Sequence, residues 1–132
     1  MVSKEIKVHT NSRSELLNIS SLLEDFLATN NIKDGICHIY IPHTTCGVTI
    51  NENADPDVKR DILMELEKTI PFSDGYLHME GNSAAHIKAS MMGFSASIPV
   101  LGGRPATGVW QDLYLCEFDG PRTRKVRFSF IQ

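Results

Sequence analysis

The sequence has few of the features that define several large classes of protein. It contains only three cysteines, Cys37, Cys46 and Cys116, and no two of them form a CxxC pair. A zinc ribbon and a disulfide scaffold are therefore disfavoured, and scattered thiols are typical of a reducing compartment, so we expect a cytoplasmic protein. No apolar run approaches the roughly 18 residues that cross a bilayer, and the first ten residues, MVSKEIKVHT, contain no apolar leader. We expect neither a signal peptide nor a membrane partner.

Positive charge is not in excess. The chain has 13 Lys and Arg residues against 16 Asp and Glu residues, which gives a net charge of −3. A broad nucleic-acid footprint needs a basic surface that displaces counterions, so no nucleic-acid partner is expected. A length of 132 residues suits one domain. Because the chain has neither repeats nor a dividing linker, we expect a single domain over residues 1–132.

Three segments have the periodicity or the end signals of helices. Ser12 and Glu15 form a capping-box pattern ahead of apolar residues at helical spacing. Asp55 followed by Pro56 is typical of a helix start, with an acidic N-cap and proline in the first turn. A third, alanine-rich segment ends at Gly93. The predicted helices cover residues 12–30, 55–70 and 82–92.

Strands account for most of the remaining chain. They are predicted at residues 4–10, 35–41, 46–52, 94–100, 108–118 and 122–131. The short links predict two hairpins, one around Pro42 to Thr45 and one around Asp119 to Pro121. Mostly antiparallel pairing follows, and with it an α+β fold. Four basic residues on the last strand suggest a solvated, protected edge: Arg122, Arg124, Lys125 and Arg127.

Polar side chains are concentrated in the middle third of the chain. Between positions 43 and 57 they are His43, Thr44, Thr45, Asn51, Glu52, Asn53, Asp55 and Asp57. Turns and caps use Thr, Asn and Asp in any protein, which leaves a structural reading open for most of them. His43 has no special role in turns. Cys46 could serve as a nucleophile beside a histidine, although a small buried strand residue is the simpler interpretation.

A second polar segment surrounds the start of the third predicted helix. Asn82 and His86 are four residues apart and share a helix face, and His78 and Glu80 precede them. His43, His78 and His86 could form a metal site, since three imidazoles suit Zn²⁺ or another divalent transition ion. The same imidazoles could instead hydrogen-bond an anion without metal, or form a structural pair. The spacing alone does not decide between these possibilities.

The loop around Arg104 offers another candidate contact. Gly102, Gly103, Arg104 and Pro105 could present backbone N–H groups and a guanidinium to a phosphate, or form a plain hairpin loop. Trp110 could be a stacking surface or a core aromatic residue. The sequence leaves both pairs of alternatives open.

Three segments together resemble the YjbQ-like family, also known as the secondary thiamine-phosphate synthase family: HTTCGVTINENADPDV, YLHMEGNSAAH and residues 103–111. The resemblance covers nearly the whole chain. The family signature has Ser, two aliphatic residues, two Gly and then Gly-Thr-Trp-Gln, and the matching residues here are Ser95, Ile98, Val100, Gly103, Gly108, Trp110 and Gln111. Val109 stands where the family usually has Thr, which removes one hydroxyl.

The resemblance implies a fold and an activity. It implies a distorted antiparallel sandwich with two to three helices, commonly seen as a homotrimer with its pocket near a subunit boundary. The implied activity joins a hydroxymethylpyrimidine diphosphate to a thiazole phosphate and releases pyrophosphate, often as a weak or secondary reaction. By position, the polar residues of the family correspond to His43, Thr44, Thr45, Asn51, Glu52, Asp55, His78, Glu80, Asn82, His86, Trp110 and Gln111.

Two functional interpretations follow. In the first, a transferase uses His43, Glu80 and His86 for chemistry, and Mg²⁺ accompanies the diphosphate on carboxylates such as Glu52, Asp55 or Glu80. Arg104 would neutralise developing charge. In the second, the chain is a non-catalytic, homotrimeric module that binds a phosphorylated small molecule or a metal. The substrate-binding residues expected in either case are Thr44, Thr45, Asn51, Glu52, Asp55, Asn82, Arg104, Trp110 and Gln111.

Overall fold

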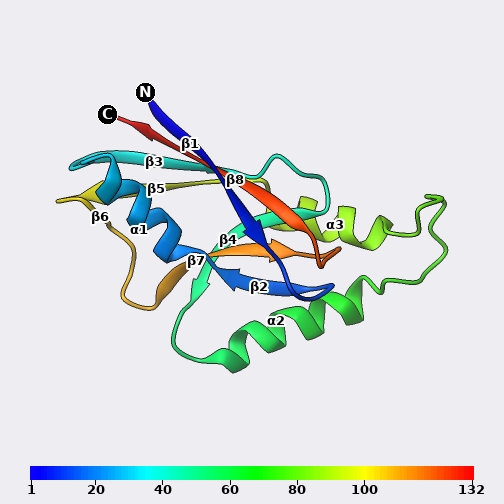
Figure 1. The fold of residues 1–132 in the computed structure, drawn as a ribbon. Helices are drawn as coiled ribbons and strands as arrows, with labels where there is room; N and C mark the ends of the chain where they lie inside the picture. Colours follow the sequence, from blue (N-terminus) through cyan, green and yellow to red (C-terminus); the bar gives the residue numbers. More distant parts are fainter.

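The α+β prediction is confirmed by a computed structural model that describes residues 1–132 (Figure 1). It has three helices and two antiparallel sheets. The helices are α1 (Ser20–Thr29), α2 (Pro56–Thr69) and α3 (Ser83–Met92). The strands are β1 (Val2–His9), β2 (Glu15–Asn18), β3 (Gly35–Tyr40), β4 (Cys46–Glu52), β5 (Ser95–Leu101), β6 (Arg104–Pro105), β7 (Gln111–Glu117) and β8 (Thr123–Ile131).

The two sheets are built from strands that are distant in sequence. One has five strands in the order β1-β8-β3-β5-β6, and the other has three in the order β2-β7-β4. Every neighbouring pair is antiparallel. Strand β8 therefore lies inside its sheet, between β1 and β3, and β7 is the central strand of the smaller sheet. The two chain ends lie side by side, because β1 pairs with β8 (Figure 1).

The main core lies between the two sheets. Val126 and Phe128 of β8 meet Leu113 and Leu115 of β7 there, and α1 adds apolar side chains such as Leu23. The opposite face of β7 is buried as well, since Tyr114 and Cys116 pack in a second cluster under α2 and α3. Period-two alternation places successive β7 side chains in different cores. None of the helices is long and apolar enough to cross a membrane.

The prediction of a helix over residues 12–30 is wrong for the first half of that segment. Residues 15–18 form strand β2, in which Leu16 pairs with Cys116 of β7 and packs in the second core. Helix α1 begins only at Ser20, whose backbone N–H donates to the Asn18 side chain. The capping box does not form, because the Glu15 carboxylate accepts from the Asn11 N–H instead. Sheet pairing outweighs the local helical pattern here.

Both predicted hairpins are also wrong. Strands β3 and β4 belong to different sheets, and so do β7 and β8, so each short link carries the chain from one sheet to the other. The final strand is consequently not an edge. Arg124 faces the interior with only 4% of its surface exposed, because β8 runs through the middle of the larger sheet.

Candidate functional site

Eight of the predicted site residues divide between the two ends of strand β4. His43, Thr44 and Thr45 precede its first residue. Asn51 and Glu52 are its last two residues, and Asp55 lies just beyond them. Trp110 and Gln111 belong to the second end, since Gln111 pairs with Glu52. Seven extended residues separate the ends by roughly 20 Å. One chain therefore does not gather all of these residues into a single pocket.

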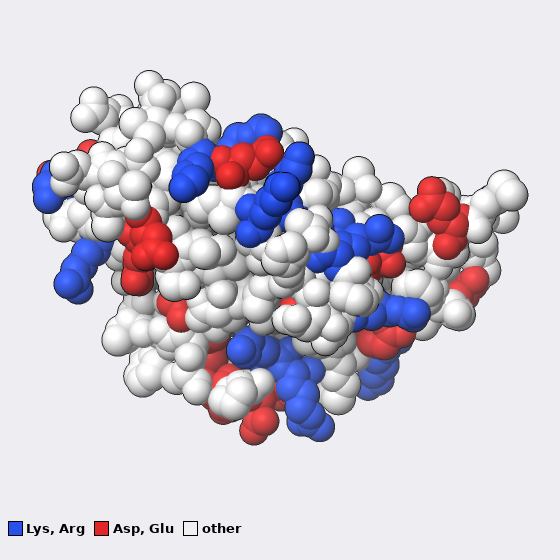
Figure 2. Space-filling model, viewed as in Figure 1, with Lys and Arg blue, Asp and Glu red and all other residues white.

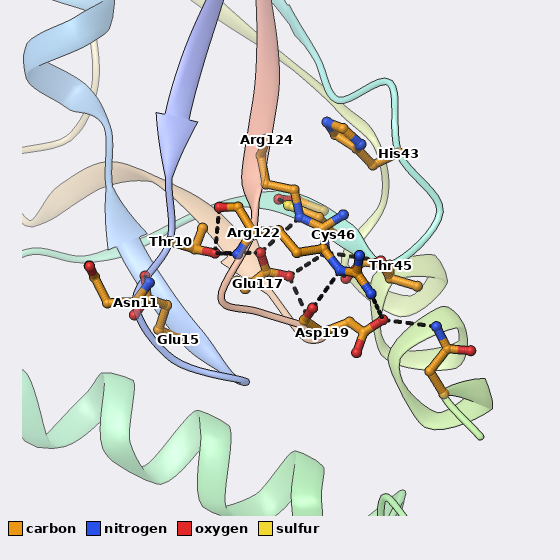
Figure 3. A network of polar contacts seen from close by, with 12 residues as sticks. Thr10, Asn11, Glu15, His43, Thr45, Cys46, Glu117, Asp119, Arg122 and Arg124 are labelled. Carbon is orange, nitrogen blue, oxygen red and sulfur yellow. Dashed lines mark hydrogen bonds and ion pairs between the residues drawn. The ribbon is translucent and has the colours of Figure 1, made fainter. Parts of the chain in front are cut away.

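At the first end, a buried ion pair joins the two sheets (Figure 3). The Arg124 guanidinium donates to both carboxylate oxygens of Glu117, with its Nε 2.8 Å from Oε1. Arg124 also donates to the hydroxyl of Thr45 at 2.9 Å, and the Thr10 hydroxyl donates to Glu117 Oε1 at 2.8 Å. We call Thr10, Thr45, Glu117 and Arg124 the buried network. It fixes the backbone of Thr45 at the entrance to β4.

Both partners of this pair are charged. Burial alone would raise the pKa of Glu117, but hydrogen bonds from Arg124, from the Asp119 N–H and from Thr10 outweigh it and hold that pKa below its usual value. Burial likewise opposes the charge of Arg124, and the bond to Glu117 raises its pKa all the same. Cys46, in the same interior, has a pKa raised to about 12 by burial. A thiol at that pKa is not a nucleophile at neutral pH, so Cys46 is a packing residue.

His43 is held by the residue that follows Arg124. The Lys125 backbone N–H donates to His43 Nε2 at 2.8 Å, so this nitrogen carries no proton and the ring is the Nδ1–H tautomer. Burial lowers the pKa of His43, and the positive charge of Arg124 lowers it further. Consecutive residues of β8 thus anchor the 43–45 segment at two points. Thr44, between them, is exposed.

A second group of polar side chains surrounds the N-terminus of α3, linked to the buried network through Asp119. The Asp119 N–H donates to Glu117 Oε2 at 3.0 Å. One Asp119 carboxylate oxygen, Oδ2, accepts from both the Asn82 side-chain amide at 2.8 Å and the Arg122 guanidinium at 3.0 Å (Figure 3). Asn82 is 7% exposed, and its Oδ1 is buried without a hydrogen-bond partner. Asn82 does not cap α3 with its side chain, so the Ser83 and Ala84 N–H groups have no hydrogen-bond partner, whereas the Ala85 N–H donates to the Asn82 carbonyl.

Two of the three predicted metal ligands lie in this second group. The rings of His78 and His86 meet edge to face with their centroids 5.5 Å apart, and His86 is one helical turn beyond Asn82. Nowhere in the chain are three or more His, Cys, Asp or Glu side chains arranged to hold a metal ion. The residues of one chain therefore do not fit a three-histidine centre. We call His78, Asn82, His86, Asp119 and Arg122 the α3 site.

The second end of β4 is occupied by turn and cap interactions. Glu52 Oε2 accepts from the backbone N–H groups of Ala54 and Asp55. Asp55 caps α2 by accepting from the Asp57 N–H at 2.9 Å, as its sequence context predicts. The Asn51 oxygen accepts from the Glu52 N–H, and the Gln111 oxygen accepts from the Gly108 N–H. Trp110 remains 63% exposed, so it is not a core residue.

Of the remaining two predicted residues, Arg104 lies apart from the α3 site and Glu80 lies next to it. Arg104 is on β6, next to α1 and at the opposite end of the molecule from α3 (Figure 1). Glu80 is exposed in a turn closed by the hydrogen bond from the Gly81 N–H to the His78 carbonyl. Within one chain, Arg104 does not join the histidines.

Five polar residues of these two groups were not predicted from the sequence to belong to a site: Thr10, Glu117, Asp119, Arg122 and Arg124. A signal for two of them was present. Glu117 occupies the inward position that follows Leu113 and Leu115, and Arg124 the inward position that precedes Val126 and Phe128. One acid and one base at inward positions of apolar strands predict a buried pair.

Comparison with known proteins agrees with this fold and these motifs. The sequence model described as "UPF0047 protein YjbQ-like" matches residues 4–132. The chain is 48% identical to a UPF0047 protein of Methanocaldococcus jannaschii over 95% of this chain and 91% of that protein. It is 48% identical to UPF0047 protein YugU of Bacillus subtilis, covering 92% of both.

Solved structures extend the similarity to the backbone. An uncharacterised YjbQ/UPF0047 protein from Clostridium acetobutylicum matches with a TM-score of 0.94 and 46% identity, over 97% of this chain and 99% of that one. A hypothetical protein from Aeropyrum pernix matches with a TM-score of 0.94 and 32% identity, over 99% and 98%. The chain therefore belongs to the UPF0047 family of YjbQ-like proteins.

Proposed function

We propose that the chain binds the phosphate groups of a small molecule at the α3 site and acts on it as a thiamine-phosphate-synthase-like transferase in the cytoplasm. The transferase would join a hydroxymethylpyrimidine diphosphate to a thiazole phosphate and release pyrophosphate. The observation that carries the proposal is Asn82, a buried amide whose oxygen has no partner at the uncapped N-terminus of α3. All three cysteines are unpaired, which supports the proposed cytoplasmic location.

The α3 site offers what a phosphate monoester or diphosphate requires. Free N–H groups at a helix N-terminus attract anions. Arg122 is tied to Asp119 by two hydrogen bonds, yet its side chain is 52% exposed, so it can still offer N–H donors to a ligand. The Asn82 oxygen accepts hydrogen bonds only, so it would take the hydroxyl of a protonated phosphate or of another ligand group.

His86 is the better placed of the two histidines for proton transfer. His43 Nε2 already accepts from the Lys125 N–H, and the pKa of His43 is lowered, so that ring is a poor proton carrier. His86 lies one turn along α3 from Asn82, against the ring of His78. We propose that His86 transfers protons at the leaving group as a general acid or base. Glu80, in the adjacent turn, is its candidate partner in that proton transfer.

A homotrimer would bring the separated residues together. Trp110 and Val109 are exposed at the second end of β4, and apolar side chains are exposed around the α3 site: Leu77, Met79, Ile87 and Met91. An exposed apolar surface of this kind supports an interface between subunits. We propose that the α3 site of one subunit faces the Glu52–Trp110 end of the next. On the face drawn in Figure 2, acidic and basic side chains are interspersed, which gives no support to a nucleic-acid partner.

The direct test is a coupled assay for thiamine phosphate, with and without Mg²⁺. His86→Ala is expected to lower kcat by about 10²- to 10⁴-fold if it transfers a proton, and Glu80→Gln is expected to lower it as well. Wild-type turnover in both variants would show that the assigned roles are wrong. If Glu52 of a neighbouring subunit completes the site, Glu52→Gln should lower kcat as well, and mixing it with His86→Ala should restore part of the activity in mixed trimers.

The alternative is a binding module without catalysis, in which case any activity is incidental. Calorimetry with the two phosphorylated substrates, run beside the assay, separates the two functions. Tight binding without turnover by the wild type would establish the module. The absence of measurable affinity for either compound would contradict both functions.

A further inference from the structure

A cavity far from the α3 site has no role in the proposed reaction. It has a volume of about 400 Å³ and lies between α1, β6 and the start of β7. Leu23, Ile98 and Leu113 form its floor, and all three belong to the main core. None of the chain's histidines lines it. Its size and its apolar floor are those of a small-molecule site.

The charged residues around this cavity do not neutralise one another. Glu24, Asp112 and Arg104 all line it, yet none of the chain's ion pairs joins Arg104 to either carboxylate. Asp112 accepts one hydrogen bond, from the Asn18 side chain at 2.7 Å. One cation and two anions therefore face the same space while remaining free to pair with a ligand.

We propose that this cavity, framed by Glu24, Asp112 and Arg104 over the apolar floor, binds a small zwitterion of the α-amino-acid type. The ligand ammonium would lie between Glu24 and Asp112, and its carboxylate would accept two hydrogen bonds from Arg104. Its aliphatic side chain would cover Leu23, Ile98 and Leu113. The net negative lining disfavours phosphates, which separates this cavity from the α3 site in ligand class as well as in place.

L-Leucine is a suitable probe, followed by NMR shifts of the backbone amides in the full-length protein. Two analogues test the charges, since 4-methylpentanoate lacks the ammonium and 3-methylbutylamine lacks the carboxylate. We expect saturable shifts centred on residues 103–107 and 112–113 with leucine, and weaker binding of both analogues. Glu24→Gln and Arg104→Gln should each weaken leucine binding by about three- to tenfold.

His86→Ala is the matched control, because it alters the α3 site and leaves the cavity untouched. Leucine affinity should be unchanged in this variant, whatever happens to phosphate binding. Three results would overturn the proposal: no saturation at millimolar leucine, affinity unaffected by both cavity variants, or equal affinity for leucine and 3-methylbutylamine. Equal affinity for leucine and 3-methylbutylamine would show that Arg104 does not bind the ligand carboxylate, and therefore that the cavity does not select a zwitterion.

Discussion

Glu117 and Arg124 form a buried ion pair that connects the central strand of the smaller sheet to an inner strand of the larger one. Arg124 also donates to the hydroxyl and carbonyl oxygens of Thr45, and the backbone N–H of the next residue, Lys125, donates to His43. Glu117 also accepts a hydrogen bond from the Asp119 N–H, and the Asp119 carboxylate accepts hydrogen bonds from Asn82 and Arg122. One buried pair therefore positions both the 43–45 segment and the α3 site.

Breaking this pair should destabilise the fold strongly. Arg124→Met leaves a buried carboxylate without its cation, which costs about 3–5 kcal/mol of the free energy of unfolding. The double variant Glu117→Leu/Arg124→Met removes both charges, so its loss should be smaller than that of Arg124→Met alone. Urea denaturation of the three proteins measures these values. A double variant less stable than Arg124→Met would show that the pair itself contributes the stability.

The stability of the fold should depend on the protonation of His43. Burial lowers the folded-state pKa of His43, and the positive charges of Arg124 and Lys125 lower it further, against the opposing negative charges of Glu117 and Glu5. Below the unfolded pKa of about 6.5 the unfolded chain binds more protons. The stability that neutral His43 contributes is therefore complete above that pH and is lost as the pH falls through the folded pKa.

His43→Gln should abolish this component of the pH dependence. The measurement is the free energy of unfolding on either side of the unfolded histidine pKa, compared between wild type and variant. Lys125→Met is the matched control, since it removes a nearby positive charge but keeps the backbone N–H that binds His43. It should raise the His43 pKa in an NMR titration. An identical pH dependence in wild type and His43→Gln would contradict the assignment.

Close packing between β4 and α3 makes Gly47 sensitive to substitution. A Cβ at Gly47 would lie 2.7 Å from the Gly93 carbonyl oxygen and 3.1 Å from Met92 Cβ. That oxygen also accepts from the Val48 N–H, so it cannot move freely. Gly47→Ala should cost about 1–3 kcal/mol of stability in thermal or urea denaturation. Gly75→Ala, where a Cβ would meet nothing within 4 Å, should cost nothing; equal losses in the two variants would contradict the packing argument.

The metal remains a prediction. His78 and His86 can supply two ligands, so Zn²⁺ at the α3 site requires a further ligand from a neighbouring subunit or from the substrate. Elemental analysis of protein purified without a His-tag should then show metal that His86→Ala removes. Metal content unchanged by His86→Ala would leave the anion-binding alternative. Anion binding should strengthen as the imidazoles protonate, whereas metal binding should weaken.

Local signals in the sequence predicted some elements well. Asp55 and Pro56 begin α2, and the alanine-rich segment before Gly93 is α3, as expected. Strand pairing was not predictable from the same signals. Cys46 lies opposite Glu117, 71 positions along the chain, and such a pairing depends on how the whole core packs rather than on nearby residues. The histidines near Asn82 were recognised, but the hydrogen bond from Asn82 to Asp119 forms only once α3 is packed beside the end of β7.

The central claim, that Arg122 and the N-terminus of α3 bind phosphate groups, is tested most directly by calorimetric titration of pyrophosphate. We expect measurable affinity in the wild type and a loss of roughly ten- to hundredfold in Arg122→Gln, the cost of one charge-assisted hydrogen-bonding group. Arg104→Gln, which removes the same charge at the other end of the molecule, should leave the affinity unchanged. Wild-type affinity in Arg122→Gln, or an equal loss in Arg104→Gln, would contradict the claim.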